Sequence, residues 1–442
     1  MVVSPGRIWD DRMGTTVEVV LKRQLGMRVL FMTSLYPPYF VGGAELSCQS
    51  HADGLQKRGH EVFVLTSEWG VEKRVVEGNV YRFLNYDRTR LGLGGKKGSS
   101  APFQLRRRYD QLRRALALSK NYNVARSVVV TVQPDVAYVW HMGSVSISPI
   151  LAAQDLGIPV IIRLPDYWLA QLRTELCLES NPIKKWYRAV LSGLGGFKRL
   201  DTRHMLANSL ALMQSYIQAG FPADSMQVIP NGVPSDLLLN ANELADLPSS
   251  GKKGDIRLLF AGRLTDLKGP DVAIQALAFL IAELGVSQAY LDIIGEGPKE
   301  YESQLQNMVK CLGLEHKVSF IGKLDHMQLI ERYTQYDVLL FPSRWAEPFG
   351  KCVIEAMARG LPVVATNRGG LAEIISDGYN GLLVPPDNPM EMAKAVKRLQ
   401  SNLELTKRIR CNALVAIQTK YSLERIVEQI EAYLQTAVLE KM

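Results

Sequence analysis

Short apolar runs of strand length alternate along the chain with longer stretches that have the hydrophobic spacing of helices. In residues 1–235 this pattern predicts helices over 44–58, 144–156 and 210–219 and strands over 28–33, 61–66, 136–140, 159–164, 205–208 and 227–229. The second half repeats the rhythm, with helices over 272–284, 301–312, 327–336, 349–359 and 390–400 and strands over 257–261, 290–294, 317–321, 338–341, 362–365 and 381–384. Strands that alternate with helices of this length form doubly wound parallel sheets. We therefore predict an α/β fold with two Rossmann-like sheets.

The rhythm is interrupted at residues 231–255, where Asn, Gly, Ser and charged residues have the composition of a linker. The predicted organisation is an N-terminal extension (1–26), a first Rossmann-like domain (27–235), a second one (236–421) and a C-terminal helix (422–442) that packs back across the domains. If the two open sheets face each other, their carboxyl ends surround a central cleft, where ligands bind in such folds.

Composition excludes several classes of protein. The chain has 442 residues, of which 47% are hydrophobic and 22% charged, and this excludes a disordered, collagen-like or coiled-coil protein. No apolar run approaches the roughly 18 residues of a membrane span, and the first 26 residues do not have the pattern of a signal peptide. The five cysteines, at 48, 177, 311, 352 and 411, are far apart in the sequence and include no close pair. This spacing indicates reduced thiols and neither a disulfide framework nor a zinc site. We expect a cytoplasmic protein.

Positive charge is concentrated in the first half. Residues 1–235 hold 29 Lys and Arg against 18 Asp and Glu, whereas residues 236–442 hold 23 against 26. Eleven of the basic residues lie between Arg88 and Arg126, where Asp110 is the single acid. Such a stretch suits an anionic substrate or an acidic membrane face, and a solvated helix beside a flexible loop explains it equally well. No nucleic-acid motif accompanies it, so nucleic acid is not an expected partner.

The most specific chemical signal is the segment FPSRWAEPFGKCVIEAMARGLPVVAT, residues 341–366. A predicted strand leads to Glu347, and the next helix is predicted to start at 349. Its first amides, which form a site suited to an anion, belong to Phe349, Gly350, Lys351 and Cys352. Glu347 and Glu355 would then be separated by about 12 Å along the helix. A diphosphate at the helix start would leave one carboxylate for a ribose and one for a transferred sugar.

Two cations follow the predicted strand at 257–261. Arg263 and Lys268 lie in FAGRLTDLKG, a strand-to-helix loop, and suit a diphosphate because one offers a planar fork and the other a point charge. Gly369 and Gly370 form another strand-to-helix turn, for which structural and binding roles are both open.

The first half has candidate residues in equivalent positions. Gly42 and Gly43 follow the first predicted strand, where glycine lets the backbone approach a phosphate or a sugar. His141 follows the strand over 136–140, and Asp166 follows the strand over 159–164. Each lies at the expected carboxyl edge of the sheet, and a structural role stays open for each.

These segments together resemble the retaining glycosyltransferases of family four, which have the GT-B fold. The two glutamates with seven residues between them, Glu347 and Glu355, fit the signature of that family. Only the first 26 residues and the 88–126 stretch lie outside the resemblance. The matching segments occur in the family's order and include PPYFVGGAE, PDYW, VIPNGV, FAGRLTDLKG, IIGEGP, VSFIGKL, FPSRWAEPFG, EAMARGLPVVAT, RGGLAEII and NGLLVPP.

The resemblance implies roles for the donor-side residues. Arg263 and Lys268 match the pair that holds the nucleotide diphosphate, Glu355 the ribose-binding carboxylate, and Glu347 the acid that faces the donor sugar. Two more residues, Lys323 and Leu324, match the loop that lines the base.

It also implies roles in the first half. Gly42 and Gly43 match the loop that closes over the donor, and His141 matches the histidine near the sugar. Asp166 would lie on the acceptor side, although Pro165 precedes it where many relatives have His.

A reaction follows from the resemblance. The family is thought to react on one face of the sugar with retention, and the leaving phosphate takes the acceptor proton. The co-substrate would be a UDP- or GDP-sugar with no other cofactor. No Asp-x-Asp triplet occurs in the chain, so we expect metal-independent transfer in which Arg263 and Lys268 neutralise the diphosphate.

The acceptor would be a glycan, a lipid-linked molecule or a small anion, bound by the basic first domain, with peripheral attachment at the inner face of the membrane. The expected role is in the synthesis of a polysaccharide, a glycolipid or another glycoconjugate. The alternatives are a nucleotide-sugar epimerase of the same fold and a non-catalytic nucleotide-sugar-binding protein.

Overall fold

The computed structural model describes residues 26–86, 119–177, 194–247 and 255–441. Its described residues form two compact units. Unit 1 holds those up to Leu164, then Trp168–Leu206 and the residues from Ile430 onward, and unit 2 holds Pro165–Tyr167 and Ala207–Gln429. The predicted boundaries near 235 and 421 stay predictions about the domains of this chain.

The first sheet has eight strands in the order β3-β4-β2-β1-β5-β6-β7-β8. The β1–β2, β1–β5, β2–β4 and β5–β6 ladders are parallel, and β3–β4 is an antiparallel hairpin. The elements along this part of the chain are β1 (Arg28–Met32), α2 (Gly43–Lys57), β2 (Glu61–Ser67), β3 (Val75–Glu77), β4 (Val80–Leu84), β5 (Val136–Val139), α4 (Ser148–Asp155), β6 (Val160–Leu164), α5 (Trp168–Cys177), β7 (Met205–Ala207), α7 (Leu210–Gln218) and β8 (Met226–Val228).

The second sheet has six strands in the order β11-β10-β9-β12-β13-β14, and all of its recorded ladders are parallel. The strand order reverses between β9 and β12, which is the switch point at which ligands bind in doubly wound folds. Its elements are β9 (Ile256–Ala261), η5 (Asp266–Lys268), α9 (Pro270–Ala282), β10 (Ala289–Ile294), α10 (Lys299–Cys311), β11 (Val318–Gly322), α11 (His326–Arg332), β12 (Val338–Phe341), α12 (Lys351–Ala358), β13 (Val363–Thr366), α13 (Leu371–Ile374), β14 (Leu382–Val384), α14 (Pro389–Ser401) and α15 (Leu403–Lys420).

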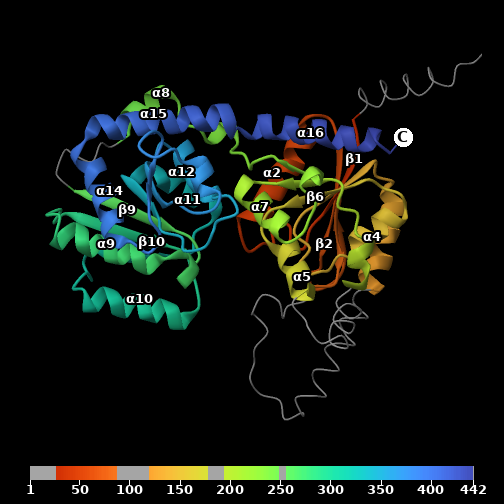
Figure 1. The fold of residues 1–442 in the computed structure, drawn as a ribbon, viewed down its shortest axis with the longest axis horizontal. Coiled ribbons are helices and arrows are strands. Elements are labelled where there is room, and N and C mark those ends of the chain that lie inside the picture. Colours follow the sequence, from red (N-terminus) through yellow and green to blue (C-terminus); the bar gives the residue numbers. More distant parts are fainter. Residues whose placement is uncertain (1–25, 87–118, 178–193, 248–254, 442) are drawn as a thin grey trace, which may run out of the picture. The chain divides into compact units, whose positions relative to one another are not determined.

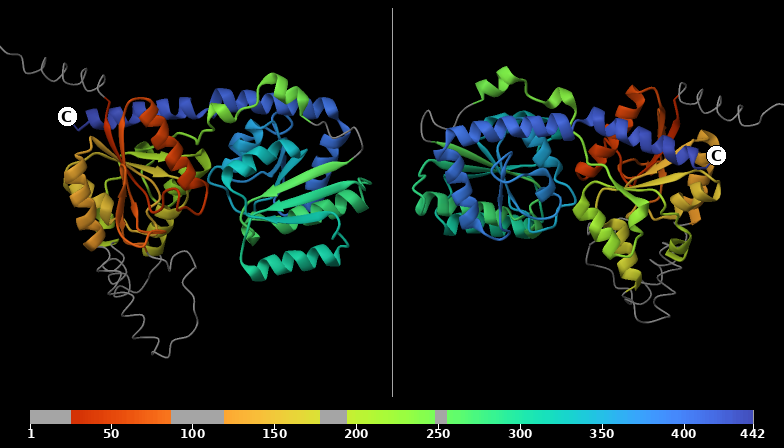
Figure 2. Two further views of the ribbon diagram at one scale, coloured as in Figure 1. Left: turned by 180° about the vertical axis from the view of Figure 1, so that it is seen from behind. Right: turned by 45° about the horizontal axis from the view of Figure 1, so that its top comes forward.

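Helices cover both faces of the second sheet. Successive residues of β9 alternate between two hydrophobic clusters, because side chains of a strand point alternately to its two faces. Leu258 and Phe260 pack in a cluster with α9, α10 and α14. Leu259 and Ala261 pack in the other cluster, with α11, α12 and α13. Figures 1 and 2 show α9 and α10 on one side of β9 and β10 and α12 on the other.

The last helix, α16 (Leu423–Leu439), contributes to both units. Its first residue belongs to unit 2, where the Leu423 amide donates to the Val233 carbonyl at 2.9 Å. Further along, Glu431 belongs to unit 1 and lies 2.8 Å from His60 Nε2. The Met27 amide donates to His60 Nδ1 at 2.9 Å. Since Nδ1 accepts, Nε2 carries the ring proton and donates it to Glu431.

The predicted fold class is confirmed, and a helix, α16, is present within the predicted C-terminal segment 422–442. The β3–β4 hairpin and the helices α5, α8 (Ala241–Asp246) and α15 were not predicted. The helix predicted over 349–359 is wrong at its start, because α12 begins at Lys351. The backbone of Gly350 has φ +117°, outside the helical region, and therefore interrupts the helix.

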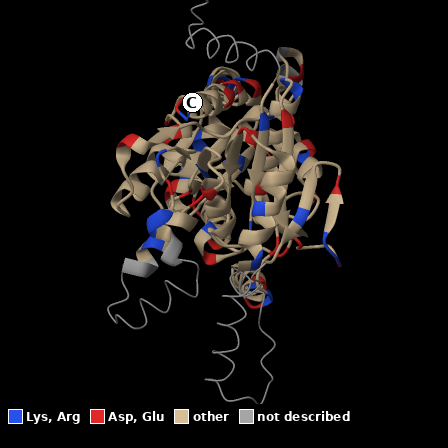
Figure 3. Ribbon diagram, turned by 90° about the vertical axis from the view of Figure 1, so that its right-hand side faces the viewer, with Lys and Arg blue, Asp and Glu red and all other residues tan. Residues whose placement is uncertain are grey.

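Among the central strands of unit 1, β1, β2 and β6 each hold one charged residue, Arg28, Glu61 and Arg163, and β5 holds none. Figure 3 marks the charged residues of the described chain by colour. No helix within the described ranges is long and apolar enough to cross a bilayer.

Candidate functional site

The loops that follow β9 and β12 hold three charged residues of the predicted site. The two strands are neighbours at the switch point of the second sheet. Arg263 and Lys268 come from the first loop, and Glu347 comes from the second. Because both strands run in the same direction, their loops emerge at one edge of the sheet. Residues that lie 79 positions apart in the sequence therefore meet there.

Lys268 and Glu347 form an ion pair at this edge. Lys268 Nζ donates to Glu347 Oε1 at 2.6 Å, and Ser343 Oγ donates to the same oxygen at 2.6 Å. The pair is largely withdrawn from solvent, with side-chain exposures of 16% for Lys268 and 6% for Glu347. Lys268 Nζ also lies 5.4 Å from the ring centre of Trp345, within the range of a cation–π contact. The carboxylate is thus fixed through one oxygen, and no contact of Oε2 is recorded among the described residues.

Glu355 is held in a similar way on α12. His326 Nε2 lies 2.8 Å from Glu355 Oε1, and Lys351 Nζ lies 3.7 Å from that oxygen. The carboxylate is 4% exposed, and the described part of the chain supplies no recorded contact to its Oε2. Burial, with a smaller contribution from the negative charge of Glu355, raises the pKa of the neighbouring Cys352 thiol to about 12. Cys352 therefore stays protonated at neutral pH.

A glycine turn fixes the backbone of Glu347. Gly370 N donates to Glu347 O at 2.8 Å, and Glu347 pairs with Gly369 in an isolated parallel bridge. Gly369 has φ +63°, and a Cβ at this position would lie 2.5 Å from Glu347 O and 2.7 Å from Glu347 N. Any side chain here would push against the backbone of Glu347. The turn at 369–370, whose role was open, thus contacts a predicted site residue.

The other residues that were predicted to bind the donor in unit 2 differ in their exposure to solvent. Arg263 is exposed, and its side chain makes no recorded hydrogen bond or ion pair with the described residues. Lys323 is exposed and lies 3.1 Å from Glu296. Phe349 is buried in the same hydrophobic cluster as Leu324 and Cys352.

The helix α12 begins two residues later than predicted. Val353 N and Ile354 N both donate to Gly350 O, so the backbone amides of Lys351 and Cys352 are the first ones of the helix. Because Glu347 precedes the helix, the helical rise alone does not set its distance from Glu355, and the separation of about 12 Å stays a prediction.

In unit 1, the loops after β1 and β5 lie side by side. The Ser34 amide donates to the His141 carbonyl at 2.7 Å. The His141 ring is 5.8 Å from the Trp168 ring, and a Cβ at Gly143 would approach its Cε1 to 3.0 Å. His141 is thus enclosed on two sides, and its ring is fixed at the switch point between β1 and β5.

The remaining predicted site residues of the first half are two glycines at the start of α2 and an aspartate after β6. Gly42 is extended (φ −152°) and precedes α2, and its amide donates to Glu45 at 2.9 Å. Gly43 begins the helix. Asp166 is half-buried, and its carbonyl accepts from the Tyr216 hydroxyl at 2.8 Å.

The sequence reasoning missed Ser343, His326 and Arg344. Ser343 and Arg344 stand inside the quoted segment 341–366, directly after the predicted strand, and that position was a signal for both. His326 had no such signal, because only the fold brings it to Glu355. Among the described residues, no group of three or more His, Cys, Asp or Glu side chains lies together in a way that could hold a metal ion.

Two family models match consecutive parts of the chain. The model of glycosyltransferase family 4 matches residues 41–237, and that of the glycosyl transferases group 1 matches residues 245–414. The chain belongs to the group 1 glycosyltransferases.

This glycosyltransferase has relatives of similar length. An uncharacterized glycosyltransferase of Methanocaldococcus jannaschii is 28% identical over 417 residues, which cover 91% of this chain and 96% of the relative. The D-inositol 3-phosphate glycosyltransferase of Acidothermus cellulolyticus is 34% identical over 190 residues, or 41% of each protein. The solved structure of Anabaena HepE in complex with UDP-glucose matches with a TM-score of 0.66 and 23% identity over 93% of this chain and 100% of that one. This likeness shows the GT-B fold.

We expect Gly369→Ala to lower the rate of sugar transfer by more than about tenfold, or about 1.4 kcal/mol, because the new Cβ displaces the Glu347 backbone. Gly313→Ala is the matched control, since Gly313 has φ +66° and a Cβ added there would meet no atom within 4 Å. Both variants should lose about 1–2 kcal/mol of stability from the positive φ, measured by denaturant unfolding. Equal transfer rates in the two variants would contradict the role of the turn.

Proposed function

We propose that this glycosyltransferase moves a sugar from a UDP- or GDP-sugar donor to an acceptor hydroxyl. The anomeric configuration of the sugar would be retained. The observation that carries the proposal is the way in which Glu347 and Glu355 are held. Each carboxylate is fixed through Oε1 by a cation and a neutral or ring donor. Each keeps Oε2 to accept hydrogen bonds from hydroxyl groups, and a sugar ring offers several of these.

The diphosphate is assigned to the cations after β9. Arg263 is exposed and offers five N–H donors in a planar fork. An ammonium has three donors, so Lys268 keeps two after its bond to Glu347. Together with the first amides of α12, these donors would neutralise the charge that develops on the leaving diphosphate.

The two glutamates take different rings in this proposal. Glu355 would accept from the hydroxyls of the ribose, with Lys323 and Leu324 beside the base. Glu347 would accept from hydroxyls of the transferred sugar, and its carboxylate lies 2.6 Å from Lys268, the cation proposed to bind the phosphate. His141 is proposed to act at the sugar, and Gly42 and Gly43 to cover the donor.

The proposed reaction is a displacement on one face of the sugar. The bond between the anomeric carbon and the diphosphate oxygen breaks, and a bond forms from that carbon to the acceptor oxygen. The acceptor proton moves to the departing phosphate oxygen, so the step needs no protein base. The product keeps the anomeric configuration of the donor.

The acceptor belongs to the basic first half in this proposal. Most of the 88–126 stretch lies outside the described residues, so binding of an anionic acceptor, or attachment to an anionic membrane surface, stays a hypothesis on sequence alone. The role in polysaccharide, glycolipid or other glycoconjugate synthesis and the cytoplasmic location are proposed on the same basis, with Asp166 on the acceptor side.

A panel of UDP-, GDP- and ADP-sugars tests the proposed donor. The correct donor should raise the melting temperature, since a ligand at 100 times its dissociation constant stabilises a fold by about 2.7 kcal/mol. Absence of a shift with every nucleotide sugar would overturn the proposal. Turnover of the donor without any acceptor would indicate the epimerase alternative instead.

We expect Glu355→Ala to weaken donor binding and Glu347→Ala mainly to lower kcat, each by at least about tenfold. The physical reason is that one carboxylate binds a spectator ring and the other the reacting sugar. Titration calorimetry and steady-state kinetics separate the two effects. Glu391→Ala is a control of the same chemistry, because Glu391 pairs with Lys394 on α14. Losses below tenfold in both site variants would refute the assignment.

Sugar transfer should persist in the presence of EDTA, because protein cations and helix amides take the place of a metal on the diphosphate. The measurement is the initial rate before and after chelation, in metal-free buffer. Loss of activity that manganese restores would show that a metal carries this charge.

A further inference from the structure

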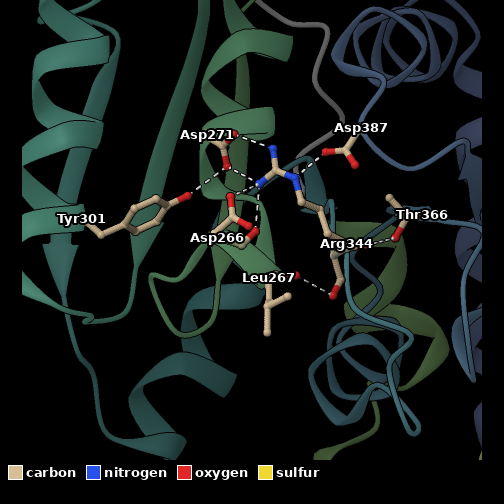
Figure 4. Close-up of polar contacts among 8 residues, drawn as sticks. Asp266, Leu267, Asp271, Tyr301, Arg344, Thr366 and Asp387 are labelled. Carbon is tan, nitrogen blue, oxygen red and sulfur yellow. Dashed lines mark hydrogen bonds and ion pairs between the residues drawn. The ribbon is translucent and has the colours of Figure 1, made fainter. Parts of the chain in front are cut away.

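The loop after β12 carries an arginine whose guanidinium contacts η5, the first turn of α9 and the loop after β14. Arg344 Nη1 and Nη2 donate to the two carboxylate oxygens of Asp271 at 2.8 and 2.6 Å. Nη1 also donates to the Asp266 carbonyl at 2.8 Å, and Nε donates to the Asp387 carboxylate. Tyr301 Oη donates to Asp271 at 3.0 Å. Figure 4 shows this cluster, which we call the Arg344 cluster.

The cluster is rigid for two reasons. A fork that donates twice to one carboxylate fixes both the direction and the distance of its partner. The Arg344 side chain is 21% exposed and that of Asp271 is 15% exposed, so solvent competes little for their contact. Burial acts to raise the pKa of Asp271, but the hydrogen bonds and charge of Arg344 outweigh it and hold that pKa below its usual value.

The Lys268–Glu347 pair belongs to two of the same segments, because Lys268 is in η5 and Glu347 is in the loop after β12. The Leu267 carbonyl accepts from the amide of Arg344 at 2.9 Å and from that of Trp345 at 3.2 Å. Lys268 follows Leu267 directly in η5, and Glu347 comes two residues after Trp345. The distance from Lys268 Nζ to the Glu347 carboxylate therefore depends on how η5 is held against the loop after β12.

Charge makes Arg344 necessary for this arrangement. Asp266, Asp271 and Asp387 converge on one cation. Without the guanidinium, three carboxylates would repel one another, and Asp271 would be a half-buried anion without this ion pair. The repulsion between the carboxylates would fall most easily by an outward shift of η5, because the side chain of Asp266 is 74% exposed. Such a shift would carry Lys268 with it.

We propose that Arg344 is a positioning residue of the transferase site, which sets the Lys268–Glu347 contact by clamping η5 against the loop after β12. Arg344 acts through other residues and needs no contact with a substrate. Its role in transfer rests on the proposed function, whereas its control of Lys268 does not.

The first test measures the accessibility of Lys268 in the full chain. Arg344→Gln should speed reductive methylation of Lys268 by at least about threefold, the scale of the smaller couplings between contacting residues. Peptide mass analysis gives the rate relative to the exposed Lys394. Arg257→Gln is the matched control, since Arg257 pairs loosely with Asp292 at 3.8 Å near the start of β9. An unchanged Lys268 rate would overturn the proposal, whatever the enzyme's substrate.

The second test is a double-mutant cycle on transfer. Arg344→Gln should lower kcat about tenfold in the natural chain and less than about threefold in the Glu347→Gln background. The reason is that Arg344 acts through the Lys268–Glu347 contact, which Glu347→Gln already weakens. Additive losses would show a merely structural role. If Arg344→Gln does not fold, Asp387→Asn keeps the fork to Asp271 and should change the Lys268 rate and kcat in the same directions by smaller factors. If no donor supports transfer, the proposed function fails and the methylation rates still decide the role of Arg344.

Discussion

The carboxyl edge of the second sheet depends on the register between the loop after β9 and the loop after β12. The Leu267 carbonyl sets this register by accepting two amides of the neighbouring loop. Hydrogen bonds of this kind have fixed lengths and directions, so they convert the pairing of two parallel strands into a defined position for the side chains beyond them. The ion pair of Lys268 with Glu347 is the result, and an unpaired edge would leave a buried carboxylate at high cost.

Glycine completes this arrangement from the other side. Gly369 lets the turn after β13 lie against the Glu347 backbone at a distance that no side chain permits. Gly350 lets the chain enter α12 without carrying Glu347 into the helix. The carboxylate that faces Lys268 is therefore held by backbone geometry on one side and by charge on the other, and neither support alone fixes both its place and its direction.

The sequence was sufficient to predict both sheets, because buried parallel strands are nearly continuous apolar runs such as Leu258–Ala261. The hairpin at 75–84 escaped because its strands are short and partly exposed. Candidate residues after β9 and β12 were predictable, since polar residues at strand ends converge at one edge. The partners of Glu355 were not, because His326 and Glu355 are 29 residues apart and only packing brings them together.

The division of α16 between the two units has a consequence for synthesis of the chain. Glu431 lies 371 residues after His60, and ribosomes add about 5–20 residues per second. His60 and the Met27 amide therefore wait about 20–70 s for the carboxylate that completes their hydrogen-bonded chain. During that interval the first sheet is exposed to the cell without its final helix, and a nascent chain of this protein is a natural client for chaperones until its last segment emerges.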